Sequence, residues 1–330
     1  MLVDKFGRQI TYLRLAVTDR CNLRCTYCMP AEGIVYEKRK DILTYEEMLF
    51  LVECFVELGV TKLRLTGGEP FVRKDFVQFL VKLNAINGLE EINITTNGTL
   101  IAKHLDKLKS LKKINAINLS IDSLNKEKFS QITRRDSFET VFETLNLLLE
   151  KGFKTKLNVV MIPNVNTNEI KDFIELTKEK NIAVRFIEEM PFNGVGKRKE
   201  AEVWDKTKIY SEIKNNYTSI IALKSEKSST SNNYKIENYK GIFGIIPAYT
   251  RTICGGCNRI RITAKGQFKL CLFDDGILNL RPFLRQNASK EDLKLLFYKL
   301  IDNKPKNGFE AEKQRKKTIE VSESMSTIGG

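Results

Sequence analysis

Histidine is almost absent from this sequence, since His104 is the single one in 330 residues. A single histidine disfavours catalytic triads built on histidine and leaves no pair for a metal site with several histidines. No apolar run approaches the roughly 18 residues that a membrane-spanning helix needs. The first eleven residues also contain no apolar stretch of the kind found in a secretory signal. We therefore expect a cytoplasmic protein with no membrane partner.

Acidic residues are in the minority, with 41 Asp and Glu against 55 Lys and Arg, which gives a formal charge of +14. A basic excess favours an anionic partner, either a nucleic acid or a small polyphosphate. A lysine-rich composition spread over solvated surfaces would produce the same number. The charge alone therefore leaves the partner open.

The seven cysteines fall into two sets of three, with Cys54 left over. In a cytosolic chain, clustered cysteines indicate metal or redox chemistry rather than a disulfide framework. Cys54 stands among apolar residues at helical spacing, which predicts a buried structural thiol.

Six strand-like runs alternate with segments of helical apolar periodicity in the first two-thirds of the chain. These runs are 12–17, 62–65, 91–94, 116–121, 156–160 and 183–187. Alternating strands and helices imply parallel pairing with right-handed crossovers. We therefore expect an α/β fold, an incomplete (βα)6 TIM-like barrel, short of the eight units that close a full barrel. A Ser, Thr, Asp or Asn three residues before a Glu predicts helix starts at Thr44, Asp136 and Asn166.

The repeat stops near residue 195, which predicts a core barrel over 1–195 and a C-terminal domain over 196–330. We expect the second part to close the mouth of the barrel. Residues 224–238 are rich in Ser, Asn and Lys and predict a mobile loop. Residues 259–263 and 267–273 predict a hairpin, and 289–301 a helix.

The first cysteine triplet, Cys21-x3-Cys25-x2-Cys28, directly follows the first predicted strand. Structural zinc requires four protein ligands, and no fourth Cys or His is nearby. Three thiolates on a [4Fe–4S] cluster instead leave one iron open, which S-adenosylmethionine can chelate through its amino and carboxylate groups. Tyr27 would then lie beside the adenine. This spacing resembles the radical S-adenosylmethionine superfamily, with zinc as the minor alternative.

A glycine-rich segment, Gly67-Gly68-Glu69-Pro70, follows the second predicted strand and strengthens this resemblance. Its glycines permit close backbone approach to a ligand. The carboxylate of Glu69 can accept a hydrogen bond from the methionyl ammonium.

The second triplet is Cys254-x2-Cys257-x13-Cys271, which again supplies three thiolates rather than four. By the same reasoning it would leave one iron of a second [4Fe–4S] cluster open for direct contact with a substrate. A C-x2-C pair on a hairpin is also common in zinc ribbons, so zinc remains a stronger alternative here than at the first triplet.

Both triplets, the segment Cys257-Asn258-Arg259-Ile260-Arg261 and the final Gly329-Gly330 together resemble one family. This is the family of molybdenum-cofactor biosynthesis protein A, the GTP 3′,8-cyclases. The resemblance extends from about Leu13 to Gly330. It implies two [4Fe–4S] clusters and cleavage of S-adenosylmethionine to a radical that removes the 3′ hydrogen of GTP. The resulting carbon radical attacks C8 of guanine, giving (8S)-3′,8-cyclo-7,8-dihydroguanosine 5′-triphosphate.

The resemblance also implies a set of contact residues. Those implied for S-adenosylmethionine are Tyr27, Gly68, Ser120 and Met190. Those implied for GTP are Arg14, Arg64, Thr95, Lys156, Arg259, Ile260 and Arg261, with Lys62 and Arg185 as weaker candidates. Independently of the resemblance, charged residues inside apolar strands require a partner, and forked guanidinium groups suit phosphate oxygens.

The resemblance further implies a reductant such as flavodoxin or ferredoxin, and transfer of the product to cyclic pyranopterin monophosphate synthase. A homodimer is possible, and no nucleic-acid partner is expected. It also implies that Gly329-Gly330 reaches the substrate site. One departure is Lys304-Pro305-Lys306-Asn307-Gly308, which lacks a histidine common in relatives, so packing there is expected to differ.

Two other functions compete. One is a radical enzyme with an auxiliary cluster that acts on a peptide or an RNA base. The other is a non-catalytic nucleic-acid binder stabilised by metal.

Overall fold

The computed structural model describes residues 1–190 and 203–315, and twelve strands in this part form one sheet. The strands are β1 (Tyr12–Ala16), β2 (Lys62–Thr66), β3 (Glu91–Thr96), β4 (Ile114–Ser120), β5 (Thr155–Met161), β6 (Ala183–Glu188), β7 (Ile220–Ala222), β8 (Asn232–Ile236), β9 (Ile242–Ile246), β10 (Arg259–Ile262), β11 (Gln267–Lys269) and β12 (Leu278–Asn279). Their order across the sheet is β12-β11-β10-β1-β2-β3-β4-β5-β6-β9-β8-β7. The predicted domain boundary at 195/196 and Gly329-Gly330 lie outside the described residues.

The six predicted strands are confirmed as β1 to β6, and they pair in parallel in chain order. The C-terminal part of the chain does not form a separate layer. Its strand β10 pairs in parallel with β1, and its strand β9 pairs in parallel with β6. The parallel sheet therefore contains two more strands than the sequence predicted, one at each edge.

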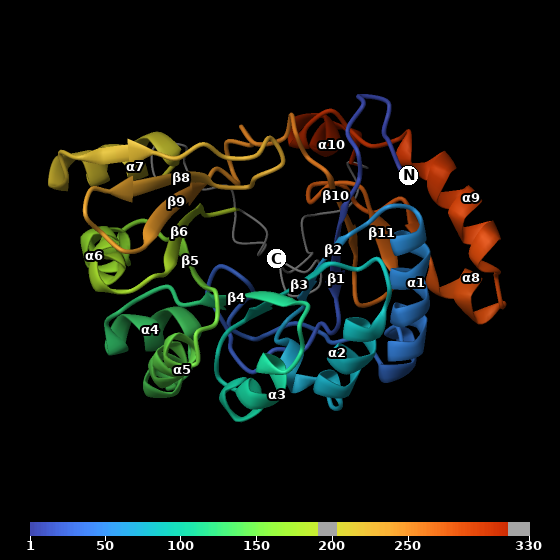
Figure 1. The fold of residues 1–330 in the computed structure, drawn as a ribbon, viewed down its shortest axis with the longest axis horizontal. Coiled ribbons are helices and arrows are strands. Elements are labelled where there is room, and N and C mark those ends of the chain that lie inside the picture. The colour runs from blue at the N-terminus through green and yellow to red at the C-terminus, as the bar shows by residue number, and fades with distance from the viewer. Residues whose placement is uncertain (191–202, 316–330) are drawn as a thin grey trace.

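The helices are α1 (Tyr45–Glu57), α2 (Phe76–Ala85), α3 (Leu105–Lys109), α4 (Lys126–Thr133), α5 (Phe138–Glu150), α6 (Ile170–Glu179), α7 (Lys206–Asn216), α8 (Arg281–Arg285), α9 (Lys290–Ile301) and α10 (Gly308–Gln314). Helices α1 to α6 follow the outer side of the curved row of strands β1 to β6 (Figure 1). On α1, Phe55 stacks on Phe268 of β11 and Phe297 of α9, so the C-terminal elements share the main core. No helix in the described ranges is long and apolar enough to cross a membrane.

One of the three predicted helix starts is displaced in the structure. The capping box of Thr44 and Glu47 is confirmed. Helix α5 begins after Ser137, one residue beyond the predicted cap. A 3-10 helix over Thr167–Glu169 begins directly after Asn166 and leads into α6, so this start is confirmed, but the Asn166 side chain does not cap it, because its Oδ1 accepts from the backbone N–H of Ile162.

The segment 224–238 is not a simple loop, because residues 232–236 form β8 between β7 and β9. Its sequence, Asn-Asn-Tyr-Lys-Ile, has little apolar periodicity, so pairing with two neighbouring strands decides its structure. The predicted hairpin is confirmed as antiparallel β10 and β11, and the predicted helix as α9. Cys54 is buried, as expected.

Candidate functional site

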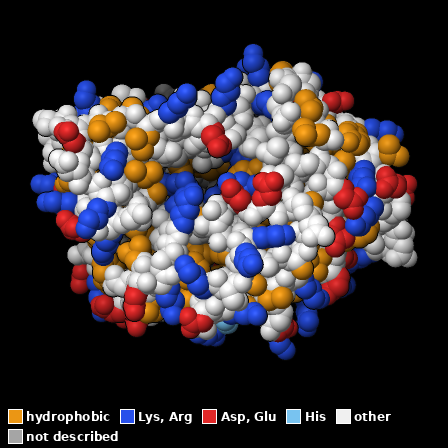
Figure 2. Space-filling model, in the orientation of Figure 1, with side chains coloured by type: hydrophobic (Ala, Val, Ile, Leu, Met, Phe, Trp, Pro, Cys, Tyr) orange, Lys and Arg blue, Asp and Glu red, His pale blue; other side chains and the backbone are white. Residues whose placement is uncertain are grey.

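One cavity of about 770 Å³ runs along the inner side of the parallel strands. Its lining includes Thr11, Thr61 and Glu90, which precede strands, as well as Thr96 and Ser120 at strand ends. The cavity therefore extends the whole length of the strands. Lysine and arginine side chains gather around the hollow in the middle of the molecular face drawn in Figure 2, with acidic side chains at one edge of it.

All six cysteines of the two triplets border this cavity. Cys21, Cys25 and Cys28 follow β1 and so lie at the C-terminal ends of the parallel strands, as expected. Cys25 is positioned by a tight turn in which its carbonyl accepts from the backbone N–H groups of Cys28 and Met29. Burial is the main reason why the pKa values of Cys21 and Cys25 are raised, so these thiols need a positive centre to ionise.

The second triplet lies at the opposite end of the strands. Cys257 precedes β10, whose N-terminal end pairs with the beginning of β1 through Arg259 and Tyr12. Cys271 follows β11, which is antiparallel to β10 and therefore returns to the same end. The C-terminal part therefore places its triplet at the N-terminal ends of the parallel strands. The parallel pairing of β10 with β1, which the sequence did not predict, sets this position.

The glycine segment after β2 contacts the backbone that leads into the first triplet. The N–H of Gly68 donates to Thr18 O at 2.9 Å, and the N–H of Glu69 donates to Arg20 O at 2.8 Å. A Cβ atom at Gly68 would fall on the carbonyl oxygen of Arg20. Gly68 lines the cavity, so the absence of a side chain brings backbone to the place where a ligand of the first triplet would lie.

Glu69 does not line the cavity, contrary to the role suggested by the sequence. Its buried carboxylate accepts from the backbone N–H groups of Phe71 and Asn97 and from the hydroxyl of Thr96. Burial raises the pKa of Glu69 to about 7 in spite of these hydrogen bonds. Glu69 thus joins the ends of β2 and β3 and supports the site from behind.

Tyr27 lies between two cysteines of the first triplet and is fixed by Asp122 at the end of β4. Its hydroxyl donates to Asp122 Oδ2 at 2.8 Å, and the other carboxylate oxygen accepts from Val160 N at 2.8 Å. Burial raises the pKa of Asp122 to about 6. Tyr27, Ser120 and Met190 all border the cavity, so the structure brings together the residues implied for S-adenosylmethionine.

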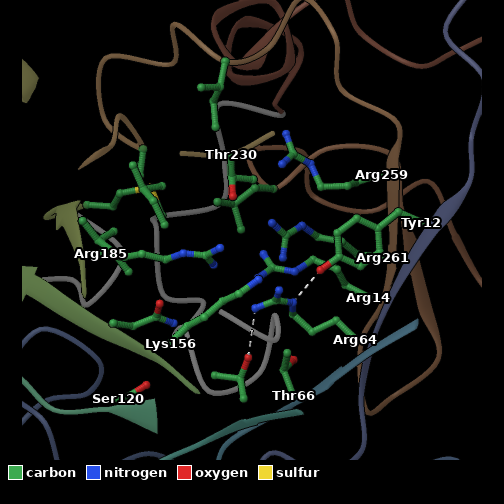
Figure 3. Close-up of a pocket in the computed structure, with 18 of the residues that line it drawn as sticks. Tyr12, Arg14, Arg64, Thr66, Ser120, Lys156, Arg185, Thr230, Arg259 and Arg261 are labelled. Atoms are coloured by element: carbon green, nitrogen blue, oxygen red, sulfur yellow. Dashed lines mark hydrogen bonds between the residues drawn. The ribbon is translucent and has the colours of Figure 1, made fainter. Parts of the chain in front are cut away.

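Six basic side chains point into the middle of the cavity and toward one another (Figure 3). We call them the cation cluster: Arg14, Arg64, Lys156, Arg185, Arg259 and Arg261. Strand alternation explains their common face, because Tyr12 and Arg14 on β1 pair in register with Arg259 and Arg261 on β10. The cluster lies between the two triplets along the strands.

Most of the cation cluster lacks an acidic partner. Within the described residues, Arg14, Arg64, Lys156, Arg185 and Arg259 form no ion pair with a carboxylate. The buried Nε atoms of Arg14 and Arg185 have no hydrogen-bond acceptor there either. Buried cations without counter-charges are costly, and a bound polyanion would remove this cost.

The pKa values of most of the cation cluster are lowered by burial and by repulsion between its positive charges. Burial first, and then Arg185 and Arg64, lower the pKa of Lys156 to about 7. Burial and the charge of Arg261 hold the pKa of Arg14 well below its usual value. Burial, together with neighbouring arginines, also lowers the pKa values of Arg185 and Arg261 to about 10.

Two of the residues implied for GTP need comment. Thr95 borders the cavity and accepts from Arg64 at 3.4 Å. Ile260 does not: its side chain is fully buried in the main core, on the opposite face of β10 from Arg259 and Arg261. Only its backbone can therefore contact a ligand.

The sequence reasoning missed several cavity residues. Tyr12 accepts a hydrogen bond from Arg64, and its pKa is lowered to about 8 because the nearby arginines outweigh the opposing effect of burial. Its position two residues before Arg14 on one strand is a signal that could have found it. Arg251, stacked between Phe273 and Phe309, and Thr230, in the loop before β8, carried no such signal.

The second triplet has a basic environment that suits thiolate ligands. Burial opposes ionisation of Cys257, yet Lys304 and Arg259 lower its pKa to about 6. Asp274 accepts from the backbone N–H of Cys271 at 2.6 Å and so fixes the third cysteine. No group of three or more Cys, His, Asp or Glu in the described ranges is arranged around a single metal ion. An iron–sulfur cluster binds each thiolate at a different iron, so the donor set fits a cluster.

Comparisons with known proteins agree with this geometry. The model of the Radical SAM superfamily matches residues 15–177, and that of Molybdenum Cofactor Synthesis C matches residues 182–310. The GTP 3′,8-cyclase of Listeria welshimeri is 39% identical over 311 residues, which are 93% of this chain and 92% of that protein. This chain belongs to the GTP 3′,8-cyclase family of radical SAM enzymes.

Other members of the GTP 3′,8-cyclase family are similar. The mitochondrial GTP 3′,8-cyclase of Arabidopsis thaliana is 41% identical over 89% of this chain and 75% of that protein. Molybdenum cofactor biosynthesis protein 1 of Dictyostelium discoideum is 42% identical over 89% of this chain but only 47% of that protein. The chain spans about half the length of this relative and of its counterparts in Drosophila melanogaster and Caenorhabditis elegans.

A solved structure shows the same fold at low sequence identity. Streptococcus suis SuiB, in its crystal structure bound to S-adenosylmethionine, has a TM-score of 0.59 and 16% identity. The match covers 90% of this chain and 66% of that one. The α/β fold with a parallel sheet is therefore shared beyond the GTP 3′,8-cyclase family.

Proposed function

We propose that this chain converts GTP to (8S)-3′,8-cyclo-7,8-dihydroguanosine 5′-triphosphate, the first step of molybdenum-cofactor biosynthesis. The observation that carries this proposal is a single cavity bordered by both cysteine triplets, with the cation cluster between them. A polyphosphate nucleotide is the ligand that would neutralise this cluster. The volume of the cavity, about 770 Å³, lies in the range of cavities that enclose small organic ligands.

Each part of the cavity has its own task in this proposal. When bound, the [4Fe–4S] cluster of the first triplet and S-adenosylmethionine supply the radical that removes the 3′ hydrogen. Tyr27, Gly68, Ser120 and Met190 contact S-adenosylmethionine. The cation cluster and Thr95 hold the triphosphate and orient the ribose, while the second triplet holds a [4Fe–4S] cluster beside the guanine base.

The cation cluster favours a nucleotide over the competing substrates. A peptide carries few negative charges, whereas a triphosphate brings several to one point, where forked guanidinium groups can bind it. The cluster also lines a cavity, with Arg64, Arg259 and Arg261 buried and the other three half-buried, while a nucleic-acid binder would need its basic residues on an accessible surface.

Several finer features belong to the same proposal. The curved sheet would form an incomplete barrel, with residues 1–195 as its core and 196–330 as the extension that carries the second cluster. A flavodoxin or ferredoxin would reduce the clusters, and cyclic pyranopterin monophosphate synthase would take the product. A cytoplasmic location and a homodimer complete the proposal.

The test is anaerobic reconstitution with iron and sulfide, followed by incubation with GTP, S-adenosylmethionine and a reductant. We expect about eight irons per chain, four per cluster, and a cyclised nucleotide together with 5′-deoxyadenosine. A peptide mixture and an RNA offered in place of GTP should release no more 5′-deoxyadenosine than the substrate-free control. Product from either of them but not from GTP, or stoichiometric zinc without iron, would refute the proposal.

A further inference from the structure

Lys304 is a buried lysine that the proposed reaction does not use. It follows α9 and is only 1% exposed. Its Nζ donates to the carbonyl oxygen of Arg259 at 2.7 Å and to that of Leu270. Arg259 lies two residues after Cys257, and Leu270 directly precedes Cys271. One ammonium group thus joins the two chain segments that carry two of the three cysteines of the second triplet.

Lys304 has no carboxylate partner in the part of the chain that the structure describes. Its ammonium lies close enough to the thiols of Cys257 and Cys271 to interact with both of them electrostatically. An ammonium taken out of water without a counter-ion is strongly destabilised. A negative charge at the triplet is therefore what the position of Lys304 requires.

The surrounding residues hold Lys304 in place. Arg8 donates to the carbonyl oxygens of Pro305 at 2.7 Å and Lys306 at 2.9 Å, directly after Lys304. The same guanidinium donates to Cys254 O at 3.3 Å and is paired with Asp4. The N-terminal segment therefore ties the Lys304 segment to the first cysteine of the triplet.

We infer that Lys304 is a positioning residue of the second cysteine triplet. Its ammonium is the counter-ion of the anionic cluster held there, and its two hydrogen bonds set the separation of Cys257 and Cys271. The inference rests on the proposed second [4Fe–4S] cluster. A nearby positive charge makes it easier to add an electron to a cluster, so Lys304 raises the reduction potential of this cluster.

The test compares Lys304→Gln, which keeps hydrogen-bond donors but loses the charge, with Lys304→Met, which loses both. Lys306→Gln is the matched control, because Lys306 is exposed and two residues away. Each full-length variant is reconstituted anaerobically, its iron is counted, and both clusters are titrated potentiometrically by electron paramagnetic resonance. S-adenosylmethionine identifies the signal of the first cluster, because only that signal should change when it is added.

In Lys304→Gln we expect the equilibrium constant for reduction of the second cluster to fall at least tenfold, which lowers its reduction potential by about 59 mV for a one-electron couple. The first cluster and Lys306→Gln should remain at wild-type values. Lys304→Met should in addition lose up to half of the iron, all of it from the second cluster. If Lys304→Gln lost as much of the second cluster as Lys304→Met, the positive charge of Lys304 would be what holds the cluster, which also supports the inference.

Three results would overturn the inference. The first is a Lys304→Gln variant with wild-type iron content and an unchanged reduction potential of the second cluster. The second is an equal shift of that potential in Lys306→Gln. The third is loss of both clusters, together with the folded circular-dichroism signal, in the Lys304 variants. The last result would assign Lys304 a purely structural role. Absence of a second cluster from wild-type protein would instead refute the proposed cofactor, so the two failures are distinguishable.

Discussion

Replacing Arg14 with Met separates two effects of the cation cluster: it destabilises the nucleotide-free protein, and it binds GTP. Arg14 is half-buried on β1 beside Arg261, Arg64 and Arg259, and its buried Nε has no acceptor in the described residues. Removing its charge relieves repulsion in the nucleotide-free protein, and Met fills most of the same volume. We therefore expect this protein to become more stable, by about 1 kcal/mol or more, since unpaired buried charge is costly.

The same substitution should weaken GTP binding. A hydrogen bond to a charged group contributes about 1.5–3 kcal/mol, and each 1.4 kcal/mol is roughly a factor of ten in the dissociation constant. The expected loss of affinity is therefore about 10- to 100-fold. In the exposed control Arg135→Met, neither stability nor affinity should change appreciably.

Differential scanning calorimetry and titration calorimetry at one ionic strength measure both quantities on protein with matched iron content. A gain of 1 kcal/mol corresponds to a melting-temperature rise of roughly 2 °C. The reasoning is refuted if Arg14→Met melts lower than wild type without nucleotide and binds GTP with wild-type affinity. Such a result would mean that Arg14 has a structural partner and no role in holding the triphosphate.

Three further predictions follow from the same geometry. Because the pKa of Lys156 is lowered to about 7 in the free protein, GTP binding at about pH 8 should restore its proton. Calorimetry in buffers of different ionisation enthalpy should detect this proton uptake in the wild type but not in Lys156→Met. The affinity of the wild type for GTP should fall as the pH rises from about 7 to 9. Gly68→Ala should cost about 1–3 kcal/mol and reduce S-adenosylmethionine binding, measured by denaturation and equilibrium dialysis, whereas Gly255→Ala, with no atom within 4 Å of the added Cβ, should be nearly neutral. Cys25→Ala should abolish release of 5′-deoxyadenosine, whereas Cys257→Ala should chiefly abolish cyclised nucleotide; normal product from Cys257→Ala would remove the substrate role of the second triplet.

The core of the fold was predictable because its signals are local. The apolar runs of β1 to β6 and the capping box at Thr44 depend on neighbouring residues in the chain, and the structure confirms them. The added strands were not, because the polar β8 acquires its structure from pairing with β7 and β9, and the placement of β9 depends on pairing with β6, far away in the sequence. The same long-range pairing, of β10 with β1, decides at which end of the cavity the second triplet lies.

Some of the site residues were likewise predictable from local sequence, and others were not. The triplets and the glycine segment carry spacing that sequence reasoning can detect, and strand alternation places Arg259 and Arg261 on one face. The roles of Glu69 and Lys304 could not be predicted, because each depends on which backbone groups a distant segment brings to it. A carboxylate or ammonium in a motif does not reveal whether it faces the cavity or supports its wall.

The central claim is that both triplets serve one substrate in one cavity, and transfer of deuterium tests it most directly. GTP labelled with deuterium at C3′ is incubated with the reconstituted protein, S-adenosylmethionine and a reductant, and 5′-deoxyadenosine is analysed by mass spectrometry. The account predicts that one deuterium enters 5′-deoxyadenosine as cyclised nucleotide forms, and that Cys257→Ala loses both signals together or the product alone. Unlabelled 5′-deoxyadenosine from wild-type protein, with the deuterium retained in GTP, would contradict it.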